Sequence, residues 1–242
     1  MIDVLAIFAH PDDVELQAGG TLLKLKKFGL RTGVLDVTRG EMGTRGTPEV
    51  RAEEAEEAAK ILKLDVRENL ELADGHVWLN EDSRTKLVRV LRRLKPKVVF
   101  THQLNDPHPD HDHIANLVRE SARLASLIKY DGDFGLERTS APIVAHSVYS
   151  RLVVPSFIVD ISEFASQKMD SIKAHKSQFY NSDSNELETM LTSKRFFTEV
   201  EAKMTYFGSL IGTEAGEPFY VREALNVENP FELLTQPMNL YS

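Results

Sequence analysis

Strand-like segments and segments with helical periodicity alternate along the first half of the chain. The predicted strands lie at residues 2–9, 31–37, 66–72 and 97–101. The predicted helices between and after them lie at residues 15–28, 49–62, 82–94 and 112–127. The last helix has the clearest pattern, because Ile114, Leu117 and Leu124 recur at helical spacing. This order predicts an α/β fold whose parallel strands are joined by right-handed crossovers.

The second half is less regular. Strands are predicted at residues 143–154 and 157–161, and Ser162 is placed to cap a helix that runs to about residue 177. A polar loop at 181–185 and a long helix at 196–211 follow. We expect one domain over residues 1–242, in which the C-terminal part packs as an extension of the mostly parallel sheet.

Two short polar motifs follow strands of the first half. His-Pro-Asp-Asp occupies positions 10–13 directly after the first strand, and His-Pro-Asp-His occupies 108–111 shortly after the fourth. In a doubly wound sheet these two strands often lie side by side, and ligands bind at the carboxyl ends of the strands. Either motif alone could be a turn with a helix cap. Together, after two such strands, they indicate an active site.

Composition narrows the chemistry of that site. The chain has no cysteine, which excludes thiolate metal ligands and a cysteine nucleophile. A catalytic zinc takes three nitrogen or oxygen ligands and keeps one position open for water. His10, one aspartate of the pair and one histidine of the second motif supply that set. The other aspartate then faces the water as a general base, and His102 and His113 are expected to stand outside the ligand set.

These motifs resemble those of the LmbE-like (PIG-L) family of zinc-dependent N-deacetylases. The resemblance extends to residues 14–16, 19–22, 36–47, 50–55, 69–70, 74–75, 177–180 and 216–219. It covers most of residues 2–222. The sequence is most similar to the BshB type, the N-acetylglucosaminyl-malate deacetylase of bacillithiol biosynthesis. The resemblance implies a Rossmann-like fold with helices on both faces of the sheet.

The resemblance also implies roles for single residues. It assigns the Zn²⁺ ligands to His10, Asp13 and His111. It makes Asp12 the general base. The ion itself is not fixed by the residues, since a site of nitrogen and oxygen donors also accepts other divalent cations.

The remaining roles concern the substrate. By resemblance, His108 stabilises the oxyanion or protonates the leaving amine, Asp110 orients His108, and Arg51 binds the sugar. Arg39 and Arg45 form a candidate anion-recognition group with Arg51, suited to the carboxylates of a malate conjugate. Alternatively, Arg39 and Arg45 belong to a solvated loop.

Two positions depart from the family pattern. The residue before His108 is often arginine in the family, and here it is Pro107. The late tyrosine that some members use at the site aligns with Phe196. These departures bear on the substrate more than on the hydrolytic chemistry.

The same observations set expectations for partners and location. The net charge of −8 disfavours nucleic acid, and the N-terminal apolar run is too short for a membrane span or a signal segment, so we expect a cytoplasmic enzyme. Family resemblance implies a homo-oligomer, in which the apolar tail at 225–234 either forms an interface or folds back.

We therefore expect a hydrolase that removes the acetyl group from N-acetylglucosaminyl-malate. One alternative is deacetylation of another N-acetyl sugar, such as N-acetylglucosamine or a chitin fragment. The other is a catalytically silent sugar- or nucleotide-binding module. No G-x-G-x-x-G sequence follows the first strand, which argues against nucleotide binding.

Overall fold

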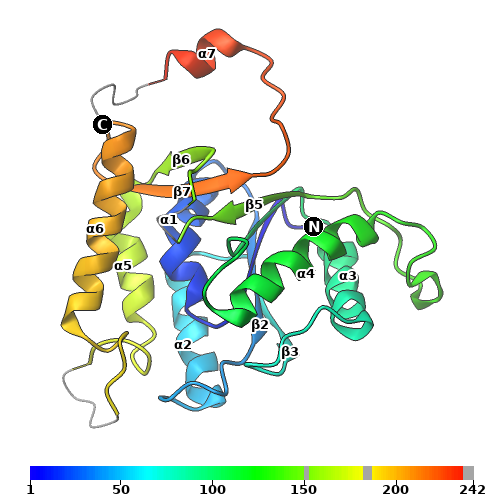
Figure 1. The fold of residues 1–242 in the computed structure, drawn as a ribbon, viewed down its shortest axis with the longest axis horizontal. Helices are drawn as coiled ribbons and strands as arrows, with labels where there is room; N and C mark the ends of the chain where they lie inside the picture. Colours follow the sequence, from blue (N-terminus) through cyan, green and yellow to red (C-terminus); the bar gives the residue numbers. More distant parts are fainter. Residues whose placement is uncertain (150–152, 182–186, 237–242) are drawn as a thin grey trace.

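The computed structural model describes residues 1–149, 153–181 and 187–236. Within these residues the strands form one seven-stranded sheet in the order β3-β2-β1-β4-β5-β7-β6 (Figure 1). The strands are β1 (Val4–Phe8), β2 (Thr32–Thr38), β3 (Val66–Leu72), β4 (Val98–Thr101), β5 (Ile143–Ser147), β6 (Phe157–Asp160) and β7 (Gly216–Val221). The helices are α1 (Asp13–Lys27), α2 (Pro48–Ile61), α3 (Glu81–Leu94), α4 (Pro109–Ala125), α5 (Ala165–Lys173), α6 (Lys194–Leu210) and α7 (Pro230–Leu234). Short 3₁₀ helices lie at η1 (Gly132–Phe134) and η2 (Ser162–Phe164).

The central strand β1 is where the strand order reverses. It pairs in parallel with β2 on one side and with β4 on the other. The strands from β1 to β5 are all parallel to their neighbours, whereas β7 runs antiparallel between β5 and β6. The predicted α/β fold, with a mostly parallel sheet and β1 beside β4, is confirmed.

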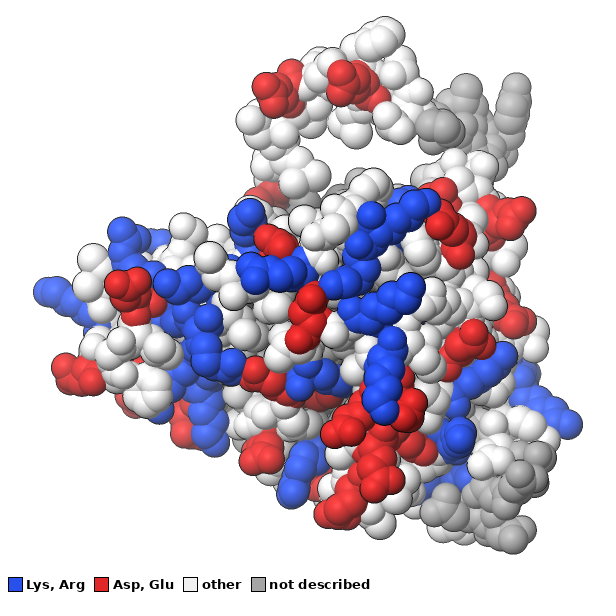
Figure 2. All heavy atoms as spheres, turned by 180° about the vertical axis from the view of Figure 1, so that it is seen from behind, with Lys and Arg blue, Asp and Glu red and all other residues white. Residues whose placement is uncertain are grey.

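The helices have polar outer surfaces. The exposed acidic side chains of α2 are an example, because Glu53, Glu56 and Glu57 point to solvent while Ala55 and Ala58 are buried. Seen from behind, acidic and basic side chains are interspersed rather than gathered into one basic surface (Figure 2). Among the described residues, no helix is both long enough and apolar enough to cross a bilayer.

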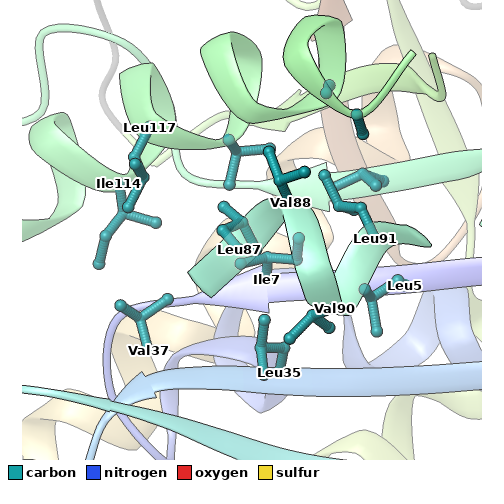
Figure 3. Close-up of a cluster of buried hydrophobic side chains, with 14 of the residues drawn as sticks. Leu5, Ile7, Leu35, Val37, Leu87, Val88, Val90, Leu91, Ile114 and Leu117 are labelled. Carbon is teal, nitrogen blue, oxygen red and sulfur yellow. The ribbon is translucent and has the colours of Figure 1, made fainter. Parts of the chain in front are cut away.

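The two faces of β1 are buried in two separate apolar clusters, because successive strand side chains point to opposite faces. Leu5 and Ile7 face α3 and α4, where Leu87, Leu91 and Ile114 cover them (Figure 3). The alternate residues of β1 are Val4, Ala6 and Phe8, which pack with α1. A strand buried on both faces is typical of parallel sheets.

Local signals fix the ends of several helices. Thr47 caps α2, whose first residue is Pro48, and Asn80 forms a capping box with Ser83 at the start of α3. Helix α4 begins at Pro109, three residues before its predicted start, because proline is favoured in the first turn of a helix.

The C-terminal part extends the sheet, as expected, but several of its elements differ from the prediction. Strand β5 ends at Ser147, not at 154, and the helix expected from 162 is split into η2 and α5, which ends at Lys173. Most of the loop predicted at 181–185 lies outside the described residues. Strand β7 and helix α7 were not predicted, because the proline inside β7 and the length of α7 are poor local signals.

A buried ion pair attaches this extension to α1. Lys168 of α5 and Glu217 of β7 lie 2.6 Å apart, and each side chain is 2% exposed. Glu217 accepts hydrogen bonds from the backbone N–H groups of Gly20 and Thr21, and Lys168 donates to the carbonyl of Leu16. Both charges therefore have backbone partners within the helix that they contact.

A second buried network lies under α1. Arg67 of β3 donates to Glu15 at 2.6 Å and to both oxygens of Asp36. The Glu15 side chain is fully buried, and its second oxygen lies 3.4 Å from the His175 ring. Burial opposes ionisation of Glu15, but the charges of Arg67 and His175 outweigh it and lower its pKa to about 2.

Replacing Glu15 with Gln should lower the free energy of unfolding by about 3–5 kcal/mol, because the change leaves the buried guanidinium of Arg67 without one of its charge partners. The folded-state pKa of about 2 lies below the ordinary value of 4.5. The stability contributed by ionised Glu15 is therefore complete above pH 4.5 and is lost as the pH falls towards 2.

Urea unfolding across this pH range measures the effect. The difference between the wild type and Glu15→Gln should shrink on acidification. Glu57→Gln is the matched control, because its side chain on α2 is 63% exposed. A difference between wild type and Glu15→Gln no larger than the control's would show that the buried pair does not stabilise the fold.

Candidate active site and metal centre

The loops that follow β1 and β4 meet at the carboxyl edge of the sheet. Ile7 is paired with Thr101, so the chain leaves both strands at the same level. The backbone N–H of Ala9 then donates to Nε2 of His102 at 2.9 Å, which joins the two loops directly. Helix α1 begins at Asp13 and α4 at Pro109, so both polar motifs lie where a strand passes into a helix.

The Asp13 carboxylate is the centre of this arrangement. Its Oδ2 atom lies 3.2 Å from Nδ1 of His10, 3.4 Å from Nε2 of His111 and 3.5 Å from Nε2 of His102. Burial opposes ionisation of Asp13, but the three imidazoles outweigh it and hold its pKa well below the usual range. A buried anion surrounded by nitrogen donors is a favourable place for a cation.

Three of these side chains have the geometry of a metal-ligand set. Ligand atoms of His10, Asp13 and His111 all lie within 4.8 Å of one another. Two imidazole nitrogens and one carboxylate oxygen match the donor set of a catalytic divalent cation that keeps a position for water. The residues present therefore fit such an ion, and the trio is the one that the family resemblance implies.

The carboxylates of the cluster also act on the two histidines. Burial lowers the pKa of His10, but hydrogen bonds to Asp13 and Asp74 outweigh it and raise the value to about 10. For His111, burial is likewise outweighed by Asp13 and Asp106, and its pKa rises to about 9. Carboxylates therefore stabilise positive charge at both rings.

Asp74 and Asp106 were not predicted as site residues. Nε2 of His10 lies 3.0 Å from Asp74, and Nδ1 of His111 lies 3.2 Å from Asp106. Carboxylates that hydrogen-bond the ring nitrogen of a metal-binding histidine fix the orientation of the ring. Each aspartate follows a strand of the parallel sheet, β3 or β4, and that position was the signal in the sequence.

Asp12 lies next to this cluster and is paired with Arg51. Nη2 of Arg51 is 3.3 Å from Oδ2 of Asp12, and Nη1 donates to the carbonyl of Gly40 at 2.9 Å. The guanidinium crosses so close to Gly40 that a Cβ there would lie 2.1 Å from Nη1. Arg51 is 4% exposed, so the structure places it as the partner of Asp12.

The other two arginines of the loop are placed differently. Arg39 is exposed, and its charge acts on Glu49 at the start of α2. Arg45 is buried, and its carbonyl accepts a hydrogen bond from Gln178. The three arginines thus differ in exposure and in partners, although they lie within thirteen positions of one another in the sequence.

His108 and Asp110 occupy the other side of the cluster. His108 is exposed at the surface, and its ring stacks on His111 at 4.5 Å. Partial desolvation of the ring lowers the pKa of His108, and the charges of His111 and His10 lower it further. Asp110 is buried, and its two oxygens accept the backbone N–H groups of Gly75 and Val77. Its carboxylate therefore anchors the loop after β3, a contact that the sequence did not suggest.

His102 was placed outside the ligand set, and the structure gives it another position in the site. Its fully buried ring stacks on His111 at 3.8 Å with planes 8° apart. Burial, together with the charge of His111, lowers the pKa of His102 to about 4, so the ring is neutral. His113 instead contacts the carbonyl of Val77 and the ring of Trp78, away from this cluster.

The two departures from the family pattern have clear positions. Pro107 is exposed. Phe196 is buried in the core, stacked on Phe179, and does not supply a polar group to the site. Tyr149 lies nearer to the cluster. Burial raises the pKa of Tyr149, and the charges of Asp13 and Asp106 raise it further.

Comparisons with known proteins agree with these motifs. The family model of PIG-L, GlcNAc-PI de-N-acetylase, matches residues 5–122. A diacetylchitobiose deacetylase of Thermococcus kodakarensis is 31% identical over 193 residues, which are 73% of this chain and 70% of that protein. A probable N-acetyl-α-D-glucosaminyl L-malate deacetylase 2 of Bacillus cereus is 26% identical over 190 residues, which are 72% of this chain and 83% of that protein.

A solved structure supports the same assignment. The crystal structure of a conserved protein from Thermus thermophilus superposes with a TM-score of 0.83 at 38% identity. The superposition covers 94% of this chain and 98% of that chain. The chain described here therefore belongs to the PIG-L, or LmbE-like, family.

Proposed function

We propose that this protein is a zinc-dependent deacetylase of N-acetylglucosamine conjugates. The observation that carries the proposal is the buried Asp13 carboxylate between His10 and His111, with Asp12 beside it. The deacetylase names of the relatives support the reaction class. Zn²⁺ is the proposed ion because imidazole and carboxylate are ligands that it accepts readily.

In this proposal His10, Asp13 and His111 hold the ion, which supplies Lewis-acid polarisation of the acetyl carbonyl and a more acidic water. Asp12 accepts the proton of the attacking water. Arg51 keeps the Asp12 carboxylate oriented through the 3.3 Å contact, while the Gly40 carbonyl fixes the guanidinium.

His108 and Asp110 complete the proposed chemistry. His108, beside His111, is placed to stabilise the oxyanion through a ring N–H or, once its ring is protonated, to give a proton to the leaving amine. Asp110 lies close to it, since ligand atoms of His10, His108 and Asp110 are within 4.8 Å of one another. In this role Asp110 orients His108 while it anchors the loop at Gly75.

The finer proposal is that the substrate is N-acetylglucosaminyl-malate, which would place the enzyme in cytoplasmic bacillithiol biosynthesis. The Bacillus cereus relative supports it. The Thermococcus kodakarensis relative supports, with equal force, a deacetylase of another N-acetyl sugar. Arg39 and Arg45 remain proposed contacts for an anionic substrate.

We also propose that the protein is a homo-oligomer. Residues 225–234 extend away from the sheet (Figure 1), and Leu225, Phe231 and Leu234 are 56%, 74% and 69% exposed. Apolar side chains this exposed are typical of interfaces. The mixed charge of the face in Figure 2 supports the expectation that nucleic acid is not a partner.

Amine release measured on zinc-loaded protein tests the function. We expect turnover of N-acetylglucosaminyl-malate, with N-acetylglucosamine and N,N′-diacetylchitobiose assayed in parallel. A preference for the malate conjugate supports the bacillithiol assignment, and a preference for a neutral sugar moves the assignment to other N-acetyl sugars. No release of amine from any of the three would contradict the proposed reaction.

Asp12→Asn should keep the bound metal and lower kcat by about 10²–10⁴-fold, because the amide cannot accept the proton of the water. Metal content by atomic absorption and kcat on the best substrate measure the two effects. Asp82→Asn on α3 is the matched control, because its side chain is 71% exposed and lies outside the cluster. An Asp12→Asn protein with near wild-type kcat would remove the general-base assignment.

His111→Ala should weaken zinc binding at least about tenfold, because the set loses one of three ligands. Competition with a chelator of known affinity measures the dissociation constant. His113→Ala removes the same ring two positions along α4, where it contacts Val77 rather than the cluster. Equal affinities of the two variants would show that the ligand set is wrong.

A further inference from the structure

A polar hollow lies between α4 and the loop that follows β4. Its volume is about 560 Å³. Arg119 and Asn116 of α4 form one wall, Tyr220 and Arg222 at the end of β7 form another, and Asn105 stands at the rim. No residue of the proposed catalytic set lines it, so it is distinct from the metal centre.

The polar part of the lining contains two guanidinium groups, and Leu104, Val153 and Val154 supply the apolar remainder. Within the described residues, neither guanidinium has an ion-pair or hydrogen-bond partner, although Arg119 is partly buried. The Tyr220 hydroxyl accepts the backbone N–H of Leu104 at 2.9 Å, so its own proton is left to donate. Among the described residues that line the hollow, none carries a carboxylate.

The charges of Arg119 and Arg222 act on a neighbouring histidine. His146 stacks on Tyr220 at 5.0 Å, and its pKa is lowered by burial and further by Arg119 and Arg222. Two carboxylates are near. Asp112 is engaged through the backbone N–H of Asn105, and Glu223 follows Arg222 in the chain and acts on His146.

Leu104 and Asn105, which line the hollow, belong to the loop between β4 and α4 that carries Asp106 and His108. The backbone N–H of Leu104 donates a hydrogen bond to Tyr220, and the backbone of Asn105 has the left-handed conformation, with a φ of 60°. The next residue is Asp106, whose carboxylate contacts His111. A ligand held by the two arginines would therefore lie against the segment that positions a proposed metal ligand.

We propose that this hollow binds a carboxylate or phosphate group through Arg119 and Arg222. Planar guanidinium groups form paired, charge-assisted hydrogen bonds with both kinds of anion, and the Tyr220 hydroxyl adds a further donor. The anion comes either with the substrate, as an acidic substituent of the sugar conjugate, or as a separate small ligand. The first source rests on the proposed deacetylase function, and the second does not.

The test compares the double variant Arg119→Gln/Arg222→Gln with the wild-type holoprotein. The first measurement is the calorimetric affinity for inorganic phosphate and for L-malate, which needs no turnover. We expect a loss of about tenfold or more in the affinity for at least one of them, because charge-assisted hydrogen bonds are lost. Anion bound at the metal centre would persist in the variant as a residual signal.

The second measurement is the ratio of kcat/KM for N-acetylglucosaminyl-malate to that for N-acetylglucosamine. A fall of about tenfold in this ratio identifies the anion as part of the substrate, because the lost hydrogen bonds then act on the conjugate alone. An unchanged ratio with lost phosphate or malate affinity identifies a separate small anion. Each result supports the site.

Arg138→Gln/Arg195→Gln is the matched control, because it removes two positive charges from exposed positions elsewhere. If the double variant at Arg119 and Arg222 equals this control in both measurements, the proposal is overturned. If no sugar is turned over by the wild type, the proposed function fails, and the calorimetric comparison alone decides the anion site.

Discussion

The parallel pairing of β1 with β4 is the constraint on which the site depends. It joins segments 94 positions apart in register, with Val4 opposite Val98 and Ile7 opposite Thr101. The chain therefore leaves both strands at the same edge, and the Ala9 N–H reaches the ring of His102. A shift of the pairing by one residue would reverse the faces of β1, which are both filled with apolar side chains.

The active-site cluster is a group of buried charges at the edge of that apolar sheet. Asp13 is surrounded by three imidazoles, and two of these have a further carboxylate behind them, Asp74 or Asp106. Burial of any one of these charges alone would be unfavourable. Their mutual contacts compensate for this cost of burial. The same contacts hold the nitrogen and oxygen donors close together in the absence of an ion.

Elements from the second half of the chain support the helix and the loop that carry the site residues. Glu217 of β7 and Lys168 of α5 bond to the backbone of α1, the helix that begins with Asp13. Tyr220 of the same strand holds the loop before Asp106. The antiparallel extension of the sheet is therefore part of what positions the site, as well as cover for its edge.

The sequence by itself determined the order of strands and helices in the first half and the positions of both motifs after strands. It also limited the candidate metal ligands to nitrogen and oxygen donors. Those features depend on local periodicity, on proline and capping residues, and on the absence of cysteine.

Only the tertiary structure decided which groups hydrogen-bond to the candidate metal ligands. The partners of His10, His111 and Asp12 include Asp74, Asp106 and Arg51, and Asp74 is 64 positions from His10. Strand β7 likewise carries a proline, and its antiparallel place between β5 and β6 is not a local property. Such contacts follow from strand order and register, which are set by packing of the whole sheet and leave no periodic signal along the chain.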